Sequence, residues 1–169
     1  MLYTIERGRI TPHRLYGLLV SESDSLLLLR REDDFLFDGY AVVRKRDVTK
    51  AYSSEANAYC QKLMRKEGVW RTPPKSIRSL PLDSWEALFR ALSGKVVVLE
   101  NERKEDFWIG PIIQQDVRWV FIHYFDSTGD WMRLERVPYR VLTVLRFGDR
   151  YSTIHAKYLP PRPEDAGAR

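Results

Sequence analysis

Cysteine is almost absent from this sequence: Cys60 is the single one among 169 residues. One thiol excludes an internal disulfide and any metal cage built from several cysteines. It also favours a reducing compartment, so we expect a cytoplasmic protein. No apolar run approaches the roughly 18 residues of a membrane-spanning helix, and the first residues lack the apolar stretch of a signal peptide. We therefore expect no membrane association.

The familiar signatures of enzymes are also missing. The sequence contains no Gly-x-Ser-x-Gly element, no glycine-rich phosphate loop and no dinucleotide-binding fingerprint. None of the three histidines, His13, His123 and His155, has another His or a Cys at metal-ligand spacing. The acidic run 32–38 ends in Asp38-Gly39, which a turn explains better than a cation site does. These absences predict a non-enzymatic protein without a metal or a cofactor.

Two reactive side chains remain, and each has a structural interpretation. Cys60 falls on the apolar stripe of a predicted helix, whereas an activated thiolate needs a polar, partly exposed site. His123 shares a strand face with Trp119, Phe121 and Phe125 at a period of two residues. We interpret both as structural residues.

The composition is that of a folded domain rich in strands. Hydrophobic residues make up 44% and charged residues 30% of the chain, with 5 Trp, 9 Tyr and 7 Phe to bury. Short apolar runs alternate with turn signals, which is typical of antiparallel strands. The predicted strands are 1–10, 15–20, 25–31, 40–44, 48–52, 95–100, 107–113, 118–125, 131–137 and 141–147.

Two helices interrupt the strands. The first begins after Ser53-Ser54 and ends at Gly68, with a predicted apolar stripe of Ala56, Tyr59, Cys60, Leu63 and Met64. The second begins at Asp83, with Glu86 completing a capping box, and ends at Gly94. Residues 69–82 contain three prolines and are predicted to form a linker. Residues 150–158 fit either a short helix or a strand, and the tail 160–169 is predicted to be disordered.

The two halves of the chain repeat one another. Gly17 and Gly110 each lie in the middle of a predicted strand, 93 residues apart, and Val48-Thr49 and Leu142-Thr143 are 94 apart. A unit of 50 to 65 residues buries little apolar surface alone, so duplication lets two units share a core or an interface. Glycines in the middle of strands fit a small, sharply bent barrel.

The order of elements in the second half resembles the Sm-like small barrel: a leading helix at 83–93, then five antiparallel strands, with a short turn at Pro138-Tyr139-Arg140 before the last. The first half looks similar, and its run from Asp33 to Thr49 resembles that of uncharacterised bacterial proteins with this fold. The resemblance predicts a mainly β protein made of two Sm-like five-stranded antiparallel barrels in tandem. The domains would be 1–68, a linker 69–82, 83–159 and the tail 160–169. The alternative is one continuous β-sandwich-like domain.

The net charge of +5 is concentrated in one segment. Residues 44–78 contain ten basic and three acidic side chains, whereas residues 81–169 are balanced. Cationic side chains on a small barrel can contact phosphates, and exposed aromatic rings can stack on unpaired bases. We therefore predict a protein that binds RNA or another nucleic acid, with phosphate contacts from seven residues: Arg44, Lys45, Arg46, Lys62, Arg65, Lys66 and Arg71.

Two other interpretations of the basic segment stay open. It can be a solvated face that only aids solubility. Alternatively, the protein is an interaction or assembly module that self-associates through edge strands, for which the apolar strand Val141–Phe147 is the candidate.

Overall fold

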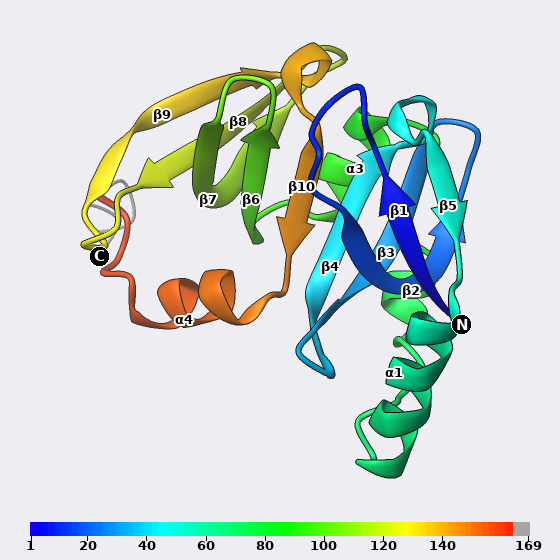
Figure 1. The fold of residues 1–169 in the computed structure, drawn as a ribbon. Coiled ribbons are helices and arrows are strands. Elements are labelled where there is room, and N and C mark those ends of the chain that lie inside the picture. The colour runs from blue at the N-terminus through cyan, green and yellow to red at the C-terminus, as the bar shows by residue number, and fades with distance from the viewer. Residues whose placement is uncertain (164–169) are drawn as a thin grey trace.

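All ten strands belong to one antiparallel sheet. The computed structural model describes residues 1–163, and its strands follow the order β5-β1-β2-β3-β4-β10-β6-β7-β8-β9 (Figure 1). The strands are β1 (Leu2–Glu6), β2 (Leu15–Glu22), β3 (Leu26–Asp33), β4 (Leu36–Arg44), β5 (Lys50–Tyr52), β6 (Val96–Asn101), β7 (Asp106–Gln115), β8 (Trp119–Phe125), β9 (Trp131–Pro138) and β10 (Val144–Phe147). The predicted mainly β class is confirmed.

Within residues 1–163, four α-helices and two short 3-10 turns accompany the strands. They are α1 (Glu55–Lys66), α2 (Lys75–Arg78), α3 (Trp85–Ala91), α4 (Arg150–Tyr158), η1 (Lys45–Asp47) and η2 (Tyr139–Val141). The Ser54 hydroxyl caps α1, and Gly68 takes the positive φ of 69° that ends it. Ser84, and not the predicted Asp83, caps α3 through its hydrogen bond from the Ala87 amide. Residues 150–158 are helical.

The strand order is the same in each half of the chain. The first half runs β5-β1-β2-β3-β4 and the second runs β10-β6-β7-β8-β9, so the last strand of each half pairs with its first. β4 and β10 then pair across the halves, with Val43 opposite Val144 and Tyr40 opposite Phe147. The strands therefore form one continuous sheet rather than two sheets side by side.

Two threonines at the repeat offset make equivalent hydrogen bonds. Thr49 donates to the Glu6 carbonyl from its amide (2.8 Å) and its hydroxyl (3.0 Å). Thr143, 94 residues later, donates to the Glu100 carbonyl in the same way, at 2.8 and 3.1 Å. The segments that end in Thr49 and Thr143, which the sequence comparison paired, therefore make the same hydrogen bonds in the structure.

Gly17 and Gly110 occupy equivalent places where a strand bends closely over its neighbour. A Cβ at Gly17 would lie 2.2 Å from the Arg30 carbonyl oxygen, and one at Gly110 would lie 2.1 Å from that of His123. The register of both strand pairs shifts two residues beyond the glycine. Glycine is required at both places because any side chain would collide with backbone.

Alternating side chains of the sheet enter different cores. Leu27 and Leu29 of β3 pack with Ile5 in a cluster that comes mostly from the first half and also includes Val144 of β10. The alternate residues of β3, Leu26 and Leu28, face the other side and join a larger cluster with α3 and the second half. That larger core spans the β4·β10 seam, so the halves share buried apolar surface.

The predicted linker is part of the packed structure. Pro73 and Leu82 are buried, and Ile77 of α2 packs against the large core. The Arg71 carbonyl accepts a 2.6 Å hydrogen bond from Arg30, and the Leu82 carbonyl accepts one of 2.6 Å from Ser23. Composition alone predicted a spacer, but the apolar side chains among the prolines bind this segment to the sheet.

Two further expectations are wrong. Strand β10 pairs on both sides, with β4 and β6, so the apolar run 141–147 is central and not an edge. Of the predicted apolar stripe of α1, only Met64 is buried, and Tyr59 is 62% exposed. The helix attaches to β1 through polar contacts instead: Thr4 bonds to Asn57 and the Leu2 amide donates to Gln61.

The end of the chain lies partly outside the described residues. The predicted disordered tail covers 160–169, of which 164–169 are not described; Pro160 accepts a 2.9 Å hydrogen bond from the Trp131 indole. No helix among residues 1–163 has the length and apolar character needed to cross a membrane.

Candidate nucleic-acid interface

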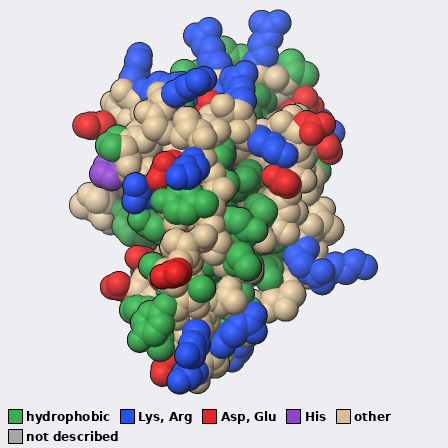
Figure 2. Space-filling view, turned by 45° about the vertical axis from the view of Figure 1, so that its right-hand side comes forward, with side chains coloured by type: hydrophobic (Ala, Val, Ile, Leu, Met, Phe, Trp, Pro, Cys, Tyr) green, Lys and Arg blue, Asp and Glu red, His purple; other side chains and the backbone are tan. Residues whose placement is uncertain are grey.

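The seven predicted phosphate-binding residues lie at two opposite ends of the molecule. Arg44, Lys45 and Arg46 stand at the end of β4 and in η1, at the top in Figure 1, whereas α1 projects from the bottom. Figure 2 shows Lys and Arg side chains gathered at both of these ends. The sequence cluster is therefore two separate surfaces.

The three basic residues at η1 have different surroundings. Arg44 is buried, forms an ion pair with Asp47 (Nε–Oδ2 3.0 Å) and donates to the Arg140 carbonyl (3.2 Å). It also donates to the Leu142 carbonyl, so it joins η1 to η2 across the seam. Lys45 pairs with Glu22 at 3.2 Å. Arg46 alone of the three is exposed.

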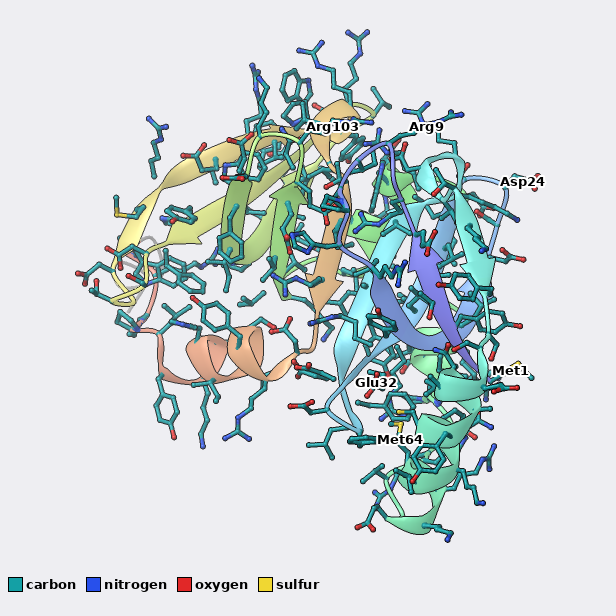
Figure 3. All side chains as sticks on the ribbon, in the orientation of Figure 1. Met1, Arg9, Asp24, Glu32, Met64 and Arg103 are labelled. Carbon is teal, nitrogen blue, oxygen red and sulfur yellow. The ribbon has the colours of Figure 1, made fainter. Side chains whose placement is uncertain are left out.

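The surroundings of Arg44 lower the pKa of its guanidinium. Burial lowers the pKa of its guanidinium; Asp47 opposes that shift, and the neighbouring Arg46 and Arg103 add to it. These interactions place Arg103, from the loop after β6, close to the η1 turn. Figure 3 shows Arg9 and Arg103 at the same upper end, each in the loop that follows the first strand of its half.

Further exposed cations complete this end of the sheet. Arg140 lies in η2, Arg118 in the β7–β8 turn, and Lys104 beside Arg103. A groove of about 340 Å³ is lined by both Arg118 and Arg140. Within the described part of the chain, none of these exposed side chains has an ion-pair partner. We call this set the basic rim: Arg9, Arg46, Arg103, Lys104, Arg118 and Arg140.

A cavity opens in the basic rim where the two halves meet. Its volume is about 440 Å³, and Arg46 and Arg140 contribute to its wall from η1 and η2. The start of α3 supplies Trp85, whose buried indole Nε1 has no hydrogen-bond partner among the described residues. Tyr139 also lines the cavity, stacked 5.5 Å from Phe89 between ring centroids.

The cavity is not purely cationic. Asp24, Asp83 and Glu86 also contribute to its wall. Burial, with added repulsion from Asp116 and Glu86, raises the pKa of the Tyr139 hydroxyl, which donates to the Asp116 carbonyl at 2.7 Å. A ligand here would meet carboxylates, an aromatic ring and guanidinium groups in one cavity.

The helix α1 and the segment that follows it carry the rest of the predicted set. Lys62, Arg65 and Lys66 are exposed, and Arg65 lies over the Trp70 ring at 4.7 Å. Arg71 is also exposed and follows Trp70. The exposed surface of α1 also includes Tyr59, which lines a cavity of about 640 Å³ together with Cys60; the four cations are not among the residues that line this cavity.

The sequence analysis missed most of the basic rim. Arg103 and Arg140 are each 94 residues after Arg9 and Arg46, so the repeat places two pairs of arginines at equivalent positions. Counting charge along the chain could not find them, because the second half is neutral overall. Applying the repeat offset to the basic residues would have done so.

The other candidate residues have structural surroundings. His123 is buried, its Nε2 lies 3.0 Å from the Met132 carbonyl oxygen, and its ring contacts Trp131 at 4.8 Å. Burial, with a smaller effect of Glu32, raises the pKa of Cys60 to about 11, so the thiol is neutral at physiological pH. Within residues 1–163, no three His, Cys, Asp or Glu side chains gather as metal ligands would.

Comparison of the chain with protein families, with characterised proteins and with solved structures gives no match. The functional argument therefore depends on the surface itself.

Proposed function

We propose that the protein binds single-stranded nucleic acid, with RNA as the first candidate, and that the basic rim holds its phosphate backbone. The observation that carries the proposal is the convergence of six exposed cations from both halves on one end of the sheet. Guanidinium groups without carboxylate partners remain available for bidentate contacts to phosphate. The binding would be non-enzymatic.

The shape of the two halves supports the same proposal. The two halves share one strand order, and we propose that they are two Sm-like units joined at the β4·β10 seam. The cavity in the rim, with Tyr139 and Trp85 in its wall, gives an unpaired base a place beside the phosphates.

A salt series tests this proposal. Fluorescence anisotropy with a labelled 12-nucleotide oligouridylate should give affinity that falls with salt, because counterions leave the phosphates on binding. Contact with about four phosphates predicts a slope of log K against log salt near −3, which is about 60-fold weaker binding at 200 mM than at 50 mM. Absence of binding at 50 mM salt, or an affinity independent of salt, contradicts the proposal.

A second candidate function is assembly of several copies. The outer strands of the sheet, β5 and β9, correspond in the repeat to β10 and β4, which pair with each other at the seam. Edge-to-edge pairing of β5 with β9 of another copy would extend the sheet. Light scattering during size-exclusion chromatography tests for assembly. A mass that stays at 20.0 kDa at all protein concentrations contradicts this second candidate.

A further inference from the structure

The two halves have equivalent outer faces, but only one is covered. In the first half, Leu26 and Leu28 of β3 and Val42 of β4 point away from that half's own cluster and are fully buried. They pack with α3 and the second half, which makes this outer face part of the large core.

A continuous segment of the chain, from Trp70 into α3, covers the first outer face. Its Trp70 ring lies 5.5 Å from the Phe37 ring, and its Arg71 carbonyl accepts a 2.6 Å hydrogen bond from Arg30. Farther along the segment, the Leu82 carbonyl accepts a 2.6 Å hydrogen bond from the Ser23 hydroxyl, and the segment continues into α3. The cover of this face is therefore a segment that ends in a short helix with large apolar side chains.

The second half carries the corresponding positions on β8 and β9. The pairs Leu26–Arg44 and Leu28–Val42 correspond to Trp119–Pro138 and Phe121–Arg136. Trp119 and Phe121 are only half-buried, and Leu134 and Met132 on the same face of β9 are 51% and 48% exposed. The face that is buried in the first half thus presents open apolar surface in the second, at the end of the sheet farthest from β5 (Figure 1).

The chain itself starts along the corresponding route in the second half. After α4 it passes Trp131, whose indole donates to the Pro160 carbonyl at 2.9 Å, as Trp70 passes Phe37 in the first half. Among the described residues after Pro160, which are 161–163, none has a large apolar side chain like Leu82 or Trp85.

The positive charge around this face indicates which kind of partner would bind there. Arg136 is exposed and lies over the Trp119 ring at 4.1 Å, and Arg118 stands beside Trp119 at the groove shared with Arg140. We propose that the outer face of β8 and β9 binds a helix of a partner protein, with large apolar side chains against Phe121, Leu134 and Met132. Acidic residues of that helix would face Arg136, which does not belong to the basic rim.

A helix fits this face better than a nucleic acid does. Leucine and methionine, the most exposed apolar side chains here, offer no flat ring on which a base can stack. The Trp119 ring is already covered on one side by the Arg136 guanidinium. The equivalent face of the first half, moreover, is covered by polypeptide.

A peptide that copies the first half's own cover tests the proposal. The probe is a labelled synthetic peptide of residues 77–92 carrying Arg78→Glu and Arg90→Glu, which keeps the apolar pattern and adds acidic flanks. We expect saturable binding in anisotropy, with amide shifts in nitrogen-15 NMR spectra confined to β8 and β9. The same peptide with Trp85→Ser and Leu88→Ser should bind at least tenfold more weakly.

Protein variants locate the binding. Leu134→Ser should weaken peptide binding at least fivefold, whereas Leu36→Ser, at a side chain 57% exposed on the first half, should leave it unchanged. No saturable binding of the acidic peptide, or equal effects of the two variants, overturns the proposal. Oligouridylate affinity is measured on the same variants: a loss with Leu134→Ser would also overturn it, and no change keeps it separate from the basic rim.

Discussion

At the scale of the residue, Gly17 and Gly110 are the positions where the backbone tolerates least change. Gly17→Ala and Gly110→Ala should each destabilise the protein by more than about 3 kcal/mol, because the new methyl group meets a carbonyl oxygen at 2.2 or 2.1 Å. For a chain of this size, that is a fall in Tm of about 6–12 °C in thermal unfolding.

Gly68→Ala is the matched control for both glycine variants. Gly68 has a φ of 69°, but a Cβ added there would have no atom within 4 Å, so only the cost of its backbone conformation remains. That cost is about 1 kcal/mol. Equal losses of stability in all three variants would show that the close approach of the strands does not matter.

The neutral thiol of Cys60 gives a prediction about reactivity. Its pKa of about 11 means that the thiolate is scarce at pH 8, although each thiolate is a stronger nucleophile than one of lower pKa. Native protein should react with iodoacetamide about tenfold more slowly than urea-unfolded protein. Glu32→Gln should speed the native reaction, since the Glu32 carboxylate raises this pKa. Equal rates for native and unfolded protein would contradict the prediction.

At the scale of the element, local signals predicted most strands and helix ends, but not what each element contacts. The cap at Ser54 and the stop at Gly68 are local, so the sequence predicted α1 well. Its buried face was predicted wrongly because Asn57 and Gln61, which attach it to β1, do not count as apolar. Polar contacts between distant segments have no periodicity to detect.

The predicted linker is the element with the clearest experimental consequence. Because its carbonyl groups bond to Arg30 and Ser23 and Leu82 is buried, limited trypsin digestion of the native protein should not separate the halves at Arg71, Lys75 or Arg78. Leu82→Asp should expose these sites and yield two fragments by mass spectrometry. Rapid cleavage of the unmodified chain there would show that the segment is detached.

At the scale of the whole molecule, the sequence revealed the repeat but not how the halves join. The offsets of Gly17 with Gly110 and of Thr49 with Thr143 were visible in one dimension and recur in the hydrogen bonds. The pairing of β4 with β10 could not be predicted from the sequence. An apolar run such as 141–147 is compatible with an edge strand and with a central strand of a sheet. The basic rim depends on that pairing, since it places η1 beside η2.

The central claim is that the basic rim, and not α1, binds nucleic acid. The direct measurement compares oligouridylate affinity over the salt series for Arg46→Ala/Arg140→Ala with that for Lys62→Ala/Lys66→Ala, two pairs of exposed cations at opposite ends. The account predicts that the first pair weakens binding and reduces the salt slope by about 1.4, while the second changes neither. Loss of binding with the α1 pair and none with the rim pair would contradict it.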